Sequence, residues 1–361
     1  MTNARVVLLS SGTHSADARI HRLAGALTKN GYSVDLWSPG NSSDAPSSVT
    51  YHRAFGGRGF LGRILRDIAL PFHSFRSDIV VVVSPDLIPL TYLLTRINRR
   101  KFIVDLYENF SKVLRDRPWA KGLIGAMAKL VAKVGENLAA KADITMVADK
   151  QVPPFVARRR LVIRNLPDRD LIQYSNSRDT SPRAIYIGDL RKSRGLFTML
   201  TAIEKSPAWT LDLVGNISPF DLAEVERWRE TSPARDRVRF HGRLAPAQSW
   251  KIAEGAWVGL SLLESTPAFV EAVPSKLYEY MAAGLAIISL PLPRCVELLD
   301  ESKSGLIAAN ADEVSSILQH WGENRMAVEA LARSGKQYAD SHLNSDEEYA
   351  PLIQAIGESR G

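Results

Sequence analysis

The sequence lacks the features that mark secreted and membrane-spanning proteins. Cys295 is the only cysteine among 361 residues, which excludes an internal disulfide framework and is typical of a reducing cytoplasm. No run of 18 uncharged apolar residues occurs, because the closest candidate, 79–97, contains Asp86, Arg96 and two prolines. The apolar stretch that follows Arg5 is too short for a secretory signal. We therefore expect a cytoplasmic protein without a spanning helix.

The chain is long enough for more than one hydrophobic core, and its charge is unevenly divided. At 361 residues it exceeds the usual size of a single core, so two domains are expected. Residues 1–180 hold 27 Lys and Arg against 15 Asp and Glu, a net charge of +12, whereas residues 181–361 have a net charge of −5. An anionic partner of the first half is indicated, either nucleic acid or an acidic membrane surface. Nucleic acid is the weaker candidate, because the cations are not interleaved with a stacking platform.

Short apolar runs alternate with amphipathic segments in both halves, which is typical of parallel sheets covered by helices. In the first half we expect strands at 5–11, 33–38, 78–84, 101–106, 143–148 and 160–164, and helices at 17–29 and 119–141. In the second half we expect strands at 184–188, 210–214, 238–241, 257–263, 285–290 and 305–307, and helices at 196–205, 312–319, 323–341 and 346–356. The predicted fold is α/β, with two doubly wound Rossmann-like domains that face each other across a cleft.

The expected domain boundaries follow from the same alternation. Residues 1–165 form the first domain, and the polar, turn-rich residues 166–182 form a linker. Residues 183–343 form the second domain.

The most informative stretch is 271–284, which reads Glu-Ala-Val-Pro-Ser-Lys-Leu-Tyr-Glu-Tyr-Met-Ala-Ala-Gly. Pro274 suits the first position of a helix, and Gly284 can end that helix in a left-handed C-cap. Lys276 then lies in the first turn, where free N–H groups and the helix dipole favour an anion such as phosphate. The alternative is an amphipathic surface helix in which Lys276 pairs with Glu279, worth about 0.2–0.5 kcal/mol.

Glu271 and Glu279 bracket this turn, and the whole stretch resembles the sugar-nucleotide signature of the retaining glycosyltransferases of family 4, which have the GT-B fold. The resemblance implies that Lys276 stabilises the donor diphosphate and that Glu279 binds the ribose hydroxyls. It also implies that Glu271 lies near the donor sugar, with Pro274 and Ser275 at the nucleotide. In that fold the last helix, here near 344–361, packs back onto the first domain.

A second motif, 184–196, reads as a strand, a glycine, a basic loop and a helix start. Gly188 lets a ligand approach the backbone, and Arg194 can pair with phosphate oxygens. It resembles the entry loop of the family's second domain, which places Arg194 at the donor diphosphate. The family often has an arginine where this chain has Asp189, and Arg191 is the candidate replacement. The alternative is an exposed basic loop.

Two more strand ends resemble the nucleotide side of the family. One ends at Gly215 (Leu-Asp-Leu-Val-Gly) and the other at Gly242 (Val-Arg-Phe-His-Gly). The resemblance implies that the base is read largely by backbone groups near Arg243 and Leu244.

Two strand ends of the first half resemble the acceptor side of the family, and the resemblance implies that the acceptor lies near Gly12, Thr13, His14, Asp17, Tyr107 and Glu108. A glycine turn before a helix N-terminus suits phosphate. Alternatively, Asp17 caps its helix and His14 is a polar loop residue. Many relatives carry a histidine at the position of Tyr107, so Glu108 is the nearest polar candidate there.

Two segments of the first half, 58–76 and 119–141, combine apolar and basic residues. Basic amphipathic helices can lie in a membrane interface, and each cation contributes about 1 kcal/mol near anionic lipid. The alternative is a core-packing helix with a solvated basic face. We hypothesise peripheral contact with an anionic membrane at its cytoplasmic face.

The sequence thus predicts a retaining glycosyltransferase that moves a sugar from a UDP- or GDP-sugar to a glycan or lipid-linked acceptor in polysaccharide or glycoconjugate biosynthesis. The assigned catalytic residues are Glu271, Lys276 and Arg194. We expect no metal and no cofactor, because cations already neutralise the leaving group. The alternatives are a sugar-nucleotide epimerase or hydrolase, and a non-catalytic sugar-nucleotide-binding protein, on the same fold.

Overall fold

The computed structural model describes residues 4–13, 15–54, 60–116, 120, 122–167, 169, 171–172, 174, 177–267, 269–270 and 273–358. The chain forms two compact units. Unit 1 comprises Met1–Asn165 and Ser345–Gly361, and unit 2 comprises Leu166–Asn344. Unit 1 is therefore assembled from two segments that are distant in the sequence, whereas unit 2 is continuous.

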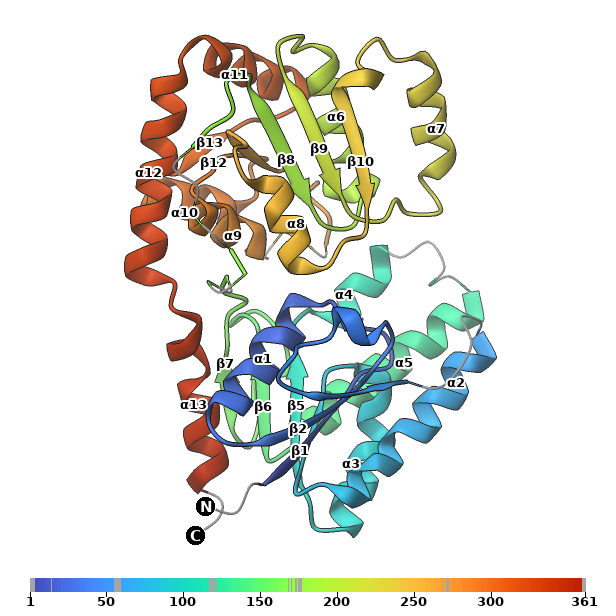
Figure 1. The fold of residues 1–361 in the computed structure, drawn as a ribbon. Coiled ribbons are helices and arrows are strands. Elements are labelled where there is room, and N and C mark those ends of the chain that lie inside the picture. Colours follow the sequence, from blue (N-terminus) through green and yellow to red (C-terminus); the bar gives the residue numbers. More distant parts are fainter. Residues whose placement is uncertain are drawn as a thin grey trace. The chain divides into compact units, whose positions relative to one another are not determined.

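Unit 1 is built on a seven-stranded parallel sheet with the strand order β3-β2-β1-β4-β5-β6-β7 (Figure 1). Its strands are β1 (Arg5–Leu9), β2 (Ser33–Ser38), β3 (Thr50–Arg53), β4 (Ile79–Val82), β5 (Lys101–Leu106), β6 (Ile144–Val147) and β7 (Arg160–Val162). Its described helices include α1 (Ala18–Lys29), α2 (Phe60–Ala69), α3 (Ile88–Ile97), α4 (Phe110–Val113), α5 (Gly122–Ala139) and α13 (Ser345–Glu358), and the 3₁₀ helix η2 (Leu70–Arg76).

The apolar residues of unit 1 pack on both faces of its sheet. Leu23 of α1 and Leu352 of α13 are buried in one core, and Ile88 of α3 and Ala139 of α5 are buried in the other. The four residues of β4 are all buried, as expected for a strand in the middle of a sheet covered by helices.

Unit 2 is built on a six-stranded parallel sheet with the strand order β10-β9-β8-β11-β12-β13. Its strands are β8 (Arg183–Ile187), β9 (Thr210–Val214), β10 (Val238–Gly242), β11 (Val258–Ser261), β12 (Ala286–Ser289) and β13 (Gly305–Ile307). Its described helices include α6 (Leu196–Glu204), α7 (Leu222–Thr231), α8 (Pro246–Ala253), α9 (Ser275–Ala283), α10 (Pro293–Ser302), α11 (Ala311–Glu323) and α12 (Arg325–His342).

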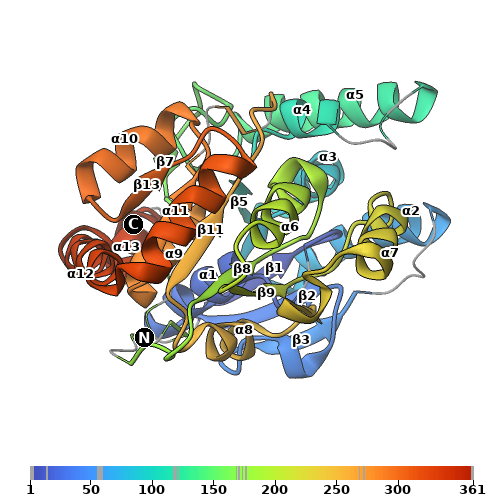
Figure 2. The ribbon, with the colours of Figure 1, turned by 90° about the horizontal axis from the view of Figure 1, so that it is seen from above.

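The order of the unit 2 strands reverses beside β8. The chain runs outward from β8 through β9 to β10 and then returns to β11 on the other side of β8; the adjacent β8 and β9 can be followed in Figure 2. Such a reversal leaves a crevice at the carboxyl ends of the strands, which is where doubly wound sheets bind ligands. The loops after β8, β9, β10 and β11 are therefore the first place to look for a site.

The α/β fold with two parallel sheets, predicted from the sequence, is confirmed. Each expected strand is present, with ends shifted by at most two residues. The prediction missed the short, polar strand β3 and the helices α3, α8 and α10, which carry prolines in their first turns. A proline is tolerated in the first turn of a helix, because its missing N–H has no partner within the helix there. It also missed α7 and α4.

Among the described residues, no helix is long and apolar enough to cross a membrane.

Candidate functional site

Helix α9 is fixed against the unit 2 sheet by Tyr280. The Tyr280 ring is fully buried, and a side chain at Gly259 of β11 would lie only 2.4 Å from that ring. The Tyr280 hydroxyl accepts a hydrogen bond from the Ile187 N–H at 3.4 Å and donates to the Leu260 carbonyl oxygen at 3.3 Å. The orientation of α9, and hence of its first turn, is set by these contacts with β8 and β11.

The ends of α9 follow the sequence prediction with one correction. The helix begins at Ser275, and Pro274 precedes it as the N-cap residue with extended backbone, so Pro274 is not the first helical residue. Gly284 ends the helix in the left-handed conformation at a φ of 70°, as predicted. Lys276 is thus in the first turn, where the N–H groups have no partner within the helix.

Lys276 lies directly over the backbone of Gly188 at the end of β8. A Cβ atom at Gly188 would be 2.9 Å from the Lys276 Nζ and 2.7 Å from its Cε. The same Nζ lies 5.6 Å from the centre of the Tyr186 ring, within the range of a cation–π interaction. The absence of a side chain at Gly188 is therefore what makes room for the Lys276 ammonium.

Three glycines line this edge of the sheet. The Gly188 N–H donates to the Val214 carbonyl at 2.7 Å, and the Gly215 N–H donates to the Gly242 carbonyl at 2.8 Å. A Cβ at Gly215 would lie 1.9 Å from the Gly188 carbonyl oxygen, so these backbones approach closely. All three residues have positive φ angles. Bare backbone of this kind lets a ligand come close to main-chain groups.

Four cations surround Asp189, the residue after Gly188. The Arg191 Nη2 donates to its Oδ2 at 2.9 Å. Partial desolvation favours a raised pKa for the Asp189 carboxyl, but the charges of Arg194, Arg191, Arg243 and Lys276 outweigh it and hold that pKa below its ordinary value. The cations predicted for the donor site thus converge on one carboxylate.

Arg194 is positioned by Gly195 and Phe269. Its guanidinium carbon lies 5.7 Å from the centre of the Phe269 ring. Gly195, at a φ of 79°, caps α6, and any side chain there would lie 2.1 Å from the Leu262 carbonyl oxygen. The loop is held by the strand end of β11, so Arg191 and Arg194 are not on a freely solvated basic loop.

Glu279 is buried, with about 9% of its surface exposed. It forms no hydrogen bond or ion pair with any residue that the structure describes, and in particular none with Lys276, three positions earlier. The surface-pair alternative for this helix is therefore wrong. A buried carboxylate is normally paired, so an unpartnered one marks a place where a ligand can supply the partner.

The remaining residues predicted for the donor side differ in burial, and one of them lies outside the described residues. Arg243 is exposed just after β10, and Leu244 is partly buried against the α9 core. Glu271 lies outside the described residues, as does His14 of unit 1.

In unit 1 the structure brings two of the acceptor-side residues together. The hydroxyls of Thr13 and Tyr107 are 3.1 Å apart, and the Thr13 N–H donates to the Ser10 hydroxyl at 2.8 Å. Burial, together with the negative charges of Glu108 and Asp17, raises the pKa of Tyr107. Tyr107 therefore remains a neutral phenol that links the ends of β1 and β5, while the neighbouring Gly12 is exposed.

Asp17 caps α1, as its alternative interpretation proposed. Its Oδ1 accepts hydrogen bonds from the N–H groups of Arg19 at 2.9 Å and Ile20 at 3.4 Å. This capping accounts for Asp17 without a ligand.

Unit 1 contains a buried ion pair that was not predicted from the sequence. Arg19 donates from Nε and Nη2 to the two carboxylate oxygens of Asp105 at 2.7 and 2.6 Å, and from Nη1 to the Ile163 carbonyl at 3.1 Å. Both side chains are at least 95% buried. Because the two residues are far apart in the sequence, the pair could not be predicted. The apolar run around Asp105 indicates only that this residue is buried.

Glu264 is a second residue that the sequence prediction missed. It follows β11, and its N–H donates to the Ser193 carbonyl at 3.1 Å, beside the basic loop. Burial raises the pKa of the Glu264 carboxyl, against the opposing charge of Lys192. The sequence signal that could have identified Glu264 is its position just after β11, a strand next to the point where the strand order reverses.

No cluster of three or more His, Cys, Asp and Glu side chains suited to a metal occurs within the described parts of the chain. The sequence contains one Asp-x-Asp triplet, Asp168-Arg169-Asp170, and both of its aspartates fall outside those parts.

The chain resembles known glycosyltransferases in part of its sequence and in its fold. Residues 193–354 match the family described as glycosyl transferase-like. No curated protein sequence matches the chain. The structure is similar to that of sucrose-phosphate synthase from Thermosynechococcus elongatus, with a TM-score of 0.74 and 15% identity over 99% of this chain and 98% of that chain.

Two further solved structures are similar over nearly the whole chain. Anabaena HepE, in complex with UDP and glucose, has a TM-score of 0.73 and 15% identity over 98% of this chain and 99% of that chain. WaaG, a glycosyltransferase involved in lipopolysaccharide biosynthesis, has a TM-score of 0.70 and 17% identity over 97% of this chain and 99% of that chain.

The fold is therefore that of the GT-B glycosyltransferases, and residues 193–354 match the family model described as glycosyl transferase-like. The resemblance drawn from the sequence is confirmed at this level, and family 4 fits it.

Proposed function

We propose that this protein transfers a sugar from a nucleoside diphosphate sugar to an acceptor, with retention at the anomeric carbon. The observation that supports this most is the cationic centre at the carboxyl ends of β8–β10, where Lys276 lies over Gly188 and the charges of Arg191, Arg194 and Arg243 reach Asp189. HepE, which has the same fold, was solved with UDP-glucose. A diphosphate is the ligand that such a centre suits best.

In the proposed reaction, breaking the bond between the sugar and the diphosphate leaves negative charge on the phosphate oxygens. Lys276, Arg194 and the first-turn N–H groups of α9 stabilise that charge, which is the largest catalytic contribution expected at such a site. The reaction then needs no metal. Glu271 is assigned to the donor sugar by the sequence resemblance.

The nucleoside is proposed to bind along the glycine edge. Glu279, buried and without a partner among the residues that the structure describes, binds the ribose hydroxyls. Backbone groups near Gly215, Gly242, Arg243 and Leu244 read the base.

The proposed acceptor is a glycan or a lipid-linked intermediate in polysaccharide or glycoconjugate biosynthesis. WaaG offers a precedent for such a pathway on this fold. In unit 1, Thr13 and Tyr107 form a hydroxyl pair at strand ends, next to Gly12 and Glu108, and we assign the acceptor to this edge.

The donor site is tested with UDP, GDP and dTDP and their sugars, first by thermal shift and then by turnover with and without acceptor. Lys276→Ala should lose most of the affinity for the diphosphate, whereas Lys251→Ala, an exposed lysine of α8, should retain it. Wild-type binding and turnover in Lys276→Ala would overturn the site. Free sugar released without an acceptor would favour a hydrolase, and binding without turnover would favour a non-catalytic protein.

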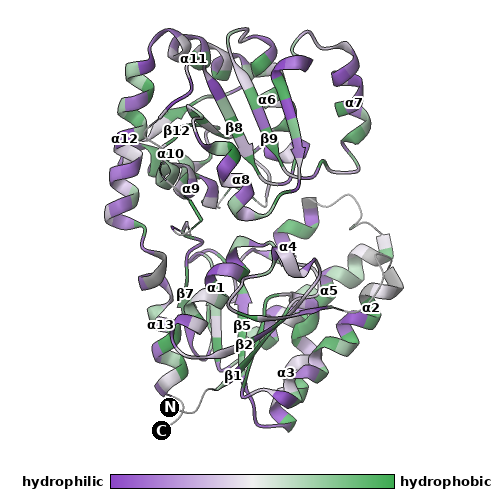
Figure 3. Ribbon diagram, viewed as in Figure 1, coloured by the Kyte–Doolittle hydropathy of each residue, from purple (hydrophilic) through white to green (hydrophobic). Residues whose placement is uncertain are grey.

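We further propose that unit 1 contacts an anionic membrane. Exposed large apolar side chains lie on α2, η2, α3 and α5, and Figure 3 shows hydrophobic stretches along α2, α3 and α5. These side chains are Ile64, Leu65, Ile68, Phe72, Phe75, Leu93, Ile97, Leu123, Met127, Leu130, Val131 and Val134. α3 packs against both η2 and α5, so these side chains belong to neighbouring elements. Lys129 and Lys133 are exposed among them. An apolar surface edged by cations suits an anionic lipid surface.

Flotation with vesicles tests the membrane contact. The double variant Leu123→Ser/Met127→Ser removes two of the most exposed apolar side chains, 85% and 64% exposed, and should reduce binding to anionic vesicles. Met326→Ser, at a 79% exposed methionine of unit 2, is the matched control. Equal binding of the wild type to neutral and anionic vesicles would contradict the proposal.

A further inference from the structure

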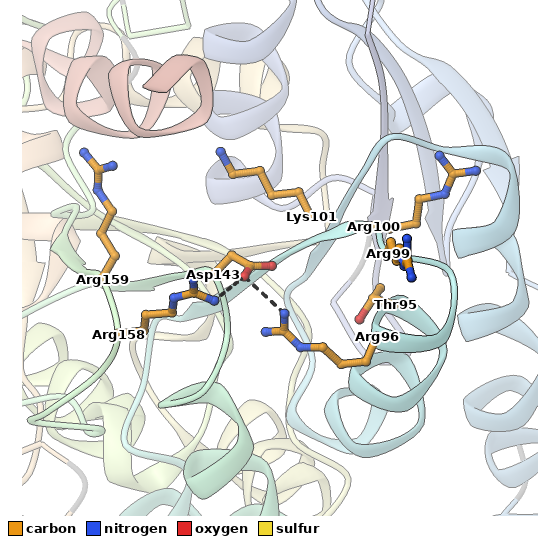
Figure 4. Close-up of a pocket in the computed structure, with 8 residues that line it drawn as sticks. All are labelled: Thr95, Arg96, Arg99, Arg100, Lys101, Asp143, Arg158 and Arg159. Atoms are coloured by element: carbon orange, nitrogen blue, oxygen red, sulfur yellow. Dashed lines mark hydrogen bonds and ion pairs between the residues drawn. The ribbon is translucent and has the colours of Figure 1, made fainter. Parts of the chain in front are cut away.

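A basic groove lies at the amino-terminal edge of the unit 1 sheet, opposite the edge at which parallel sheets usually bind ligands. It is formed by the end of α3 and the starts of β5, β6 and β7, and is lined by Thr95, Arg96, Arg99, Arg100, Lys101, Asp143, Arg158 and Arg159 (Figure 4). Its volume of about 590 Å³ is that of a small-molecule site. None of these residues takes part in the transfer proposed above.

Two of the cations have structural partners on α13. The Lys101 Nζ donates to the carbonyl oxygens of Ala355 and Ile356 at 2.8 and 3.0 Å. The Arg159 Nη1 lies 2.7 Å from the Glu358 Oε2. Both cations are placed at the C-terminal end of that helix, where positive charge is favoured. They hold α13 on unit 1, and this role accounts for them.

Arg96 and Arg158 converge on one carboxylate. Their Nη1 atoms lie 3.3 and 3.1 Å from the same Oδ1 of Asp143, as the dashed lines in Figure 4 show. The other oxygen, Oδ2, accepts the Phe102 N–H at 2.9 Å. Asp143 is also the only carboxylate among the described residues that line the groove. One negative charge therefore serves two guanidinium groups.

Arg99 and Arg100 add positive charge that the protein balances only in part. The Arg100 Nη1 is 3.7 Å from the Asp78 Oδ1, and its Nε is buried without a hydrogen-bond partner. Arg99 forms no ion pair with any residue in the described ranges. With Arg96 and Arg158 included, the groove has four guanidinium groups, and their carboxylate partners are Asp78 and Asp143. The excess of two positive charges matches an anion.

The backbone of Arg99 is unusual for an arginine. Its φ is 54°, in the left-handed region, at the position after the C-cap of α3. The Arg100 N–H donates to the Thr95 carbonyl at 2.9 Å, which is the closing hydrogen bond of a helix end where glycine is preferred. An arginine there is less stable than a glycine, so the fold alone does not explain it.

We propose that this groove binds a phosphate group with two negative charges, from either a small phosphorylated molecule or a lipid headgroup. Guanidinium groups bind phosphate oxygens in pairs, and the four arginines carry two more positive charges than their two carboxylate partners balance. The proposal does not depend on the glycosyltransferase reaction, because all of its residues lie in unit 1, on the edge of the sheet opposite the predicted acceptor residues.

Arg99→Gly is the decisive substitution, because it removes the cation and relieves the left-handed backbone at once. Lys303→Gly is a matched control: Lys303 is also basic, also follows a helix and also has a positive φ, 49°, but it belongs to unit 2. The probe is inorganic pyrophosphate, titrated by calorimetry into the full-length Lys276→Ala chain so that the candidate donor site does not contribute.

Arg99→Gly should weaken pyrophosphate binding about tenfold and should not lower the thermal midpoint, whereas Lys303→Gly should leave the affinity unchanged. Arg158→Gln, at a side chain 67% exposed, should weaken binding similarly. The lipid source is tested by flotation with phosphatidic acid vesicles. Loss of either pyrophosphate or vesicle binding in Arg99→Gly supports the groove and identifies the source. Retention of both in Arg99→Gly and Arg158→Gln overturns the proposal.

Discussion

The contact between Gly188 and Lys276 makes a sharp prediction for Gly188→Ala. The added methyl group would lie 2.7 Å from the Lys276 Cε, 2.9 Å from its Nζ and 3.1 Å from the Tyr186 hydroxyl. These distances are too short for carbon, so the flexible lysine must move. The substitution leaves every charge in place but displaces the ammonium from the glycine edge.

Two separate costs follow. The φ of 146° at Gly188 is strained for alanine and lowers the free energy of unfolding by about 1–3 kcal/mol. Displacing Lys276 removes a charge-assisted contact with the diphosphate, worth about 1.5–3 kcal/mol, which corresponds to a loss of UDP affinity of roughly 10- to 100-fold. Calorimetric titration of UDP and urea unfolding measure the two effects separately.

Gly31→Ala is the control for backbone strain. Gly31 has a φ of 81° with no atom within 4 Å of the added methyl group, so this variant should lose stability and keep its UDP affinity. In the double variant Gly188→Ala/Lys276→Ala, the methyl group has no lysine to displace, so it should add little to the loss caused by Lys276→Ala alone. Wild-type UDP affinity in Gly188→Ala, or additive losses in the double variant, would refute the assignment of Lys276 to the diphosphate.

Three further predictions concern single charges. Asp189→Asn should raise UDP affinity about fivefold by calorimetry, because the ionised carboxylate repels the diphosphate. The Asp189 side chain is 58% exposed, which limits this repulsion to about 1 kcal/mol. An unchanged affinity would indicate that the phosphates bind elsewhere. Glu264 has a raised pKa in the folded protein, so the free energy of unfolding should fall as pH rises from 4.5 through that pKa, and Glu264→Gln should flatten this slope in urea titrations. Arg19→Met should lower the free energy of unfolding by about 3–5 kcal/mol, since it leaves Asp105 buried and unpaired; a loss below 1 kcal/mol would contradict this.

Much of the fold follows from local pattern, and what was missed has local causes. The strands β2, β5, β9 and β13 have the bounds that the sequence pattern predicts. The helices α3, α8 and α10 were not predicted, although the prolines at their starts fit the first turn of a helix.

The residues of the candidate site were predicted from the sequence, but their arrangement in space was not. Gly188, Arg194 and Lys276 each stood in a recognisable motif. Their convergence depends on Tyr280, which fixes α9 on the sheet, and on the bare α-carbon of Gly188. Neither relation is local in sequence, since 93 residues separate Tyr280 from its hydrogen-bond partner Ile187.

Asp189 and Tyr107 both depart from the family pattern, and the structure indicates different consequences for the two positions. Asp189 stands where the family often has an arginine, yet it has four cations within electrostatic reach and pairs directly with Arg191. A carboxylate at this place keeps the cations together while the site is empty and weakens, without abolishing, attraction for a diphosphate. Tyr107 is half-buried, neutral and bonded to Thr13, so it offers a hydroxyl and no proton-accepting nitrogen. Chemistry that needs a histidine is therefore lost at Tyr107, whereas the donor side keeps every cation that its proposed role requires.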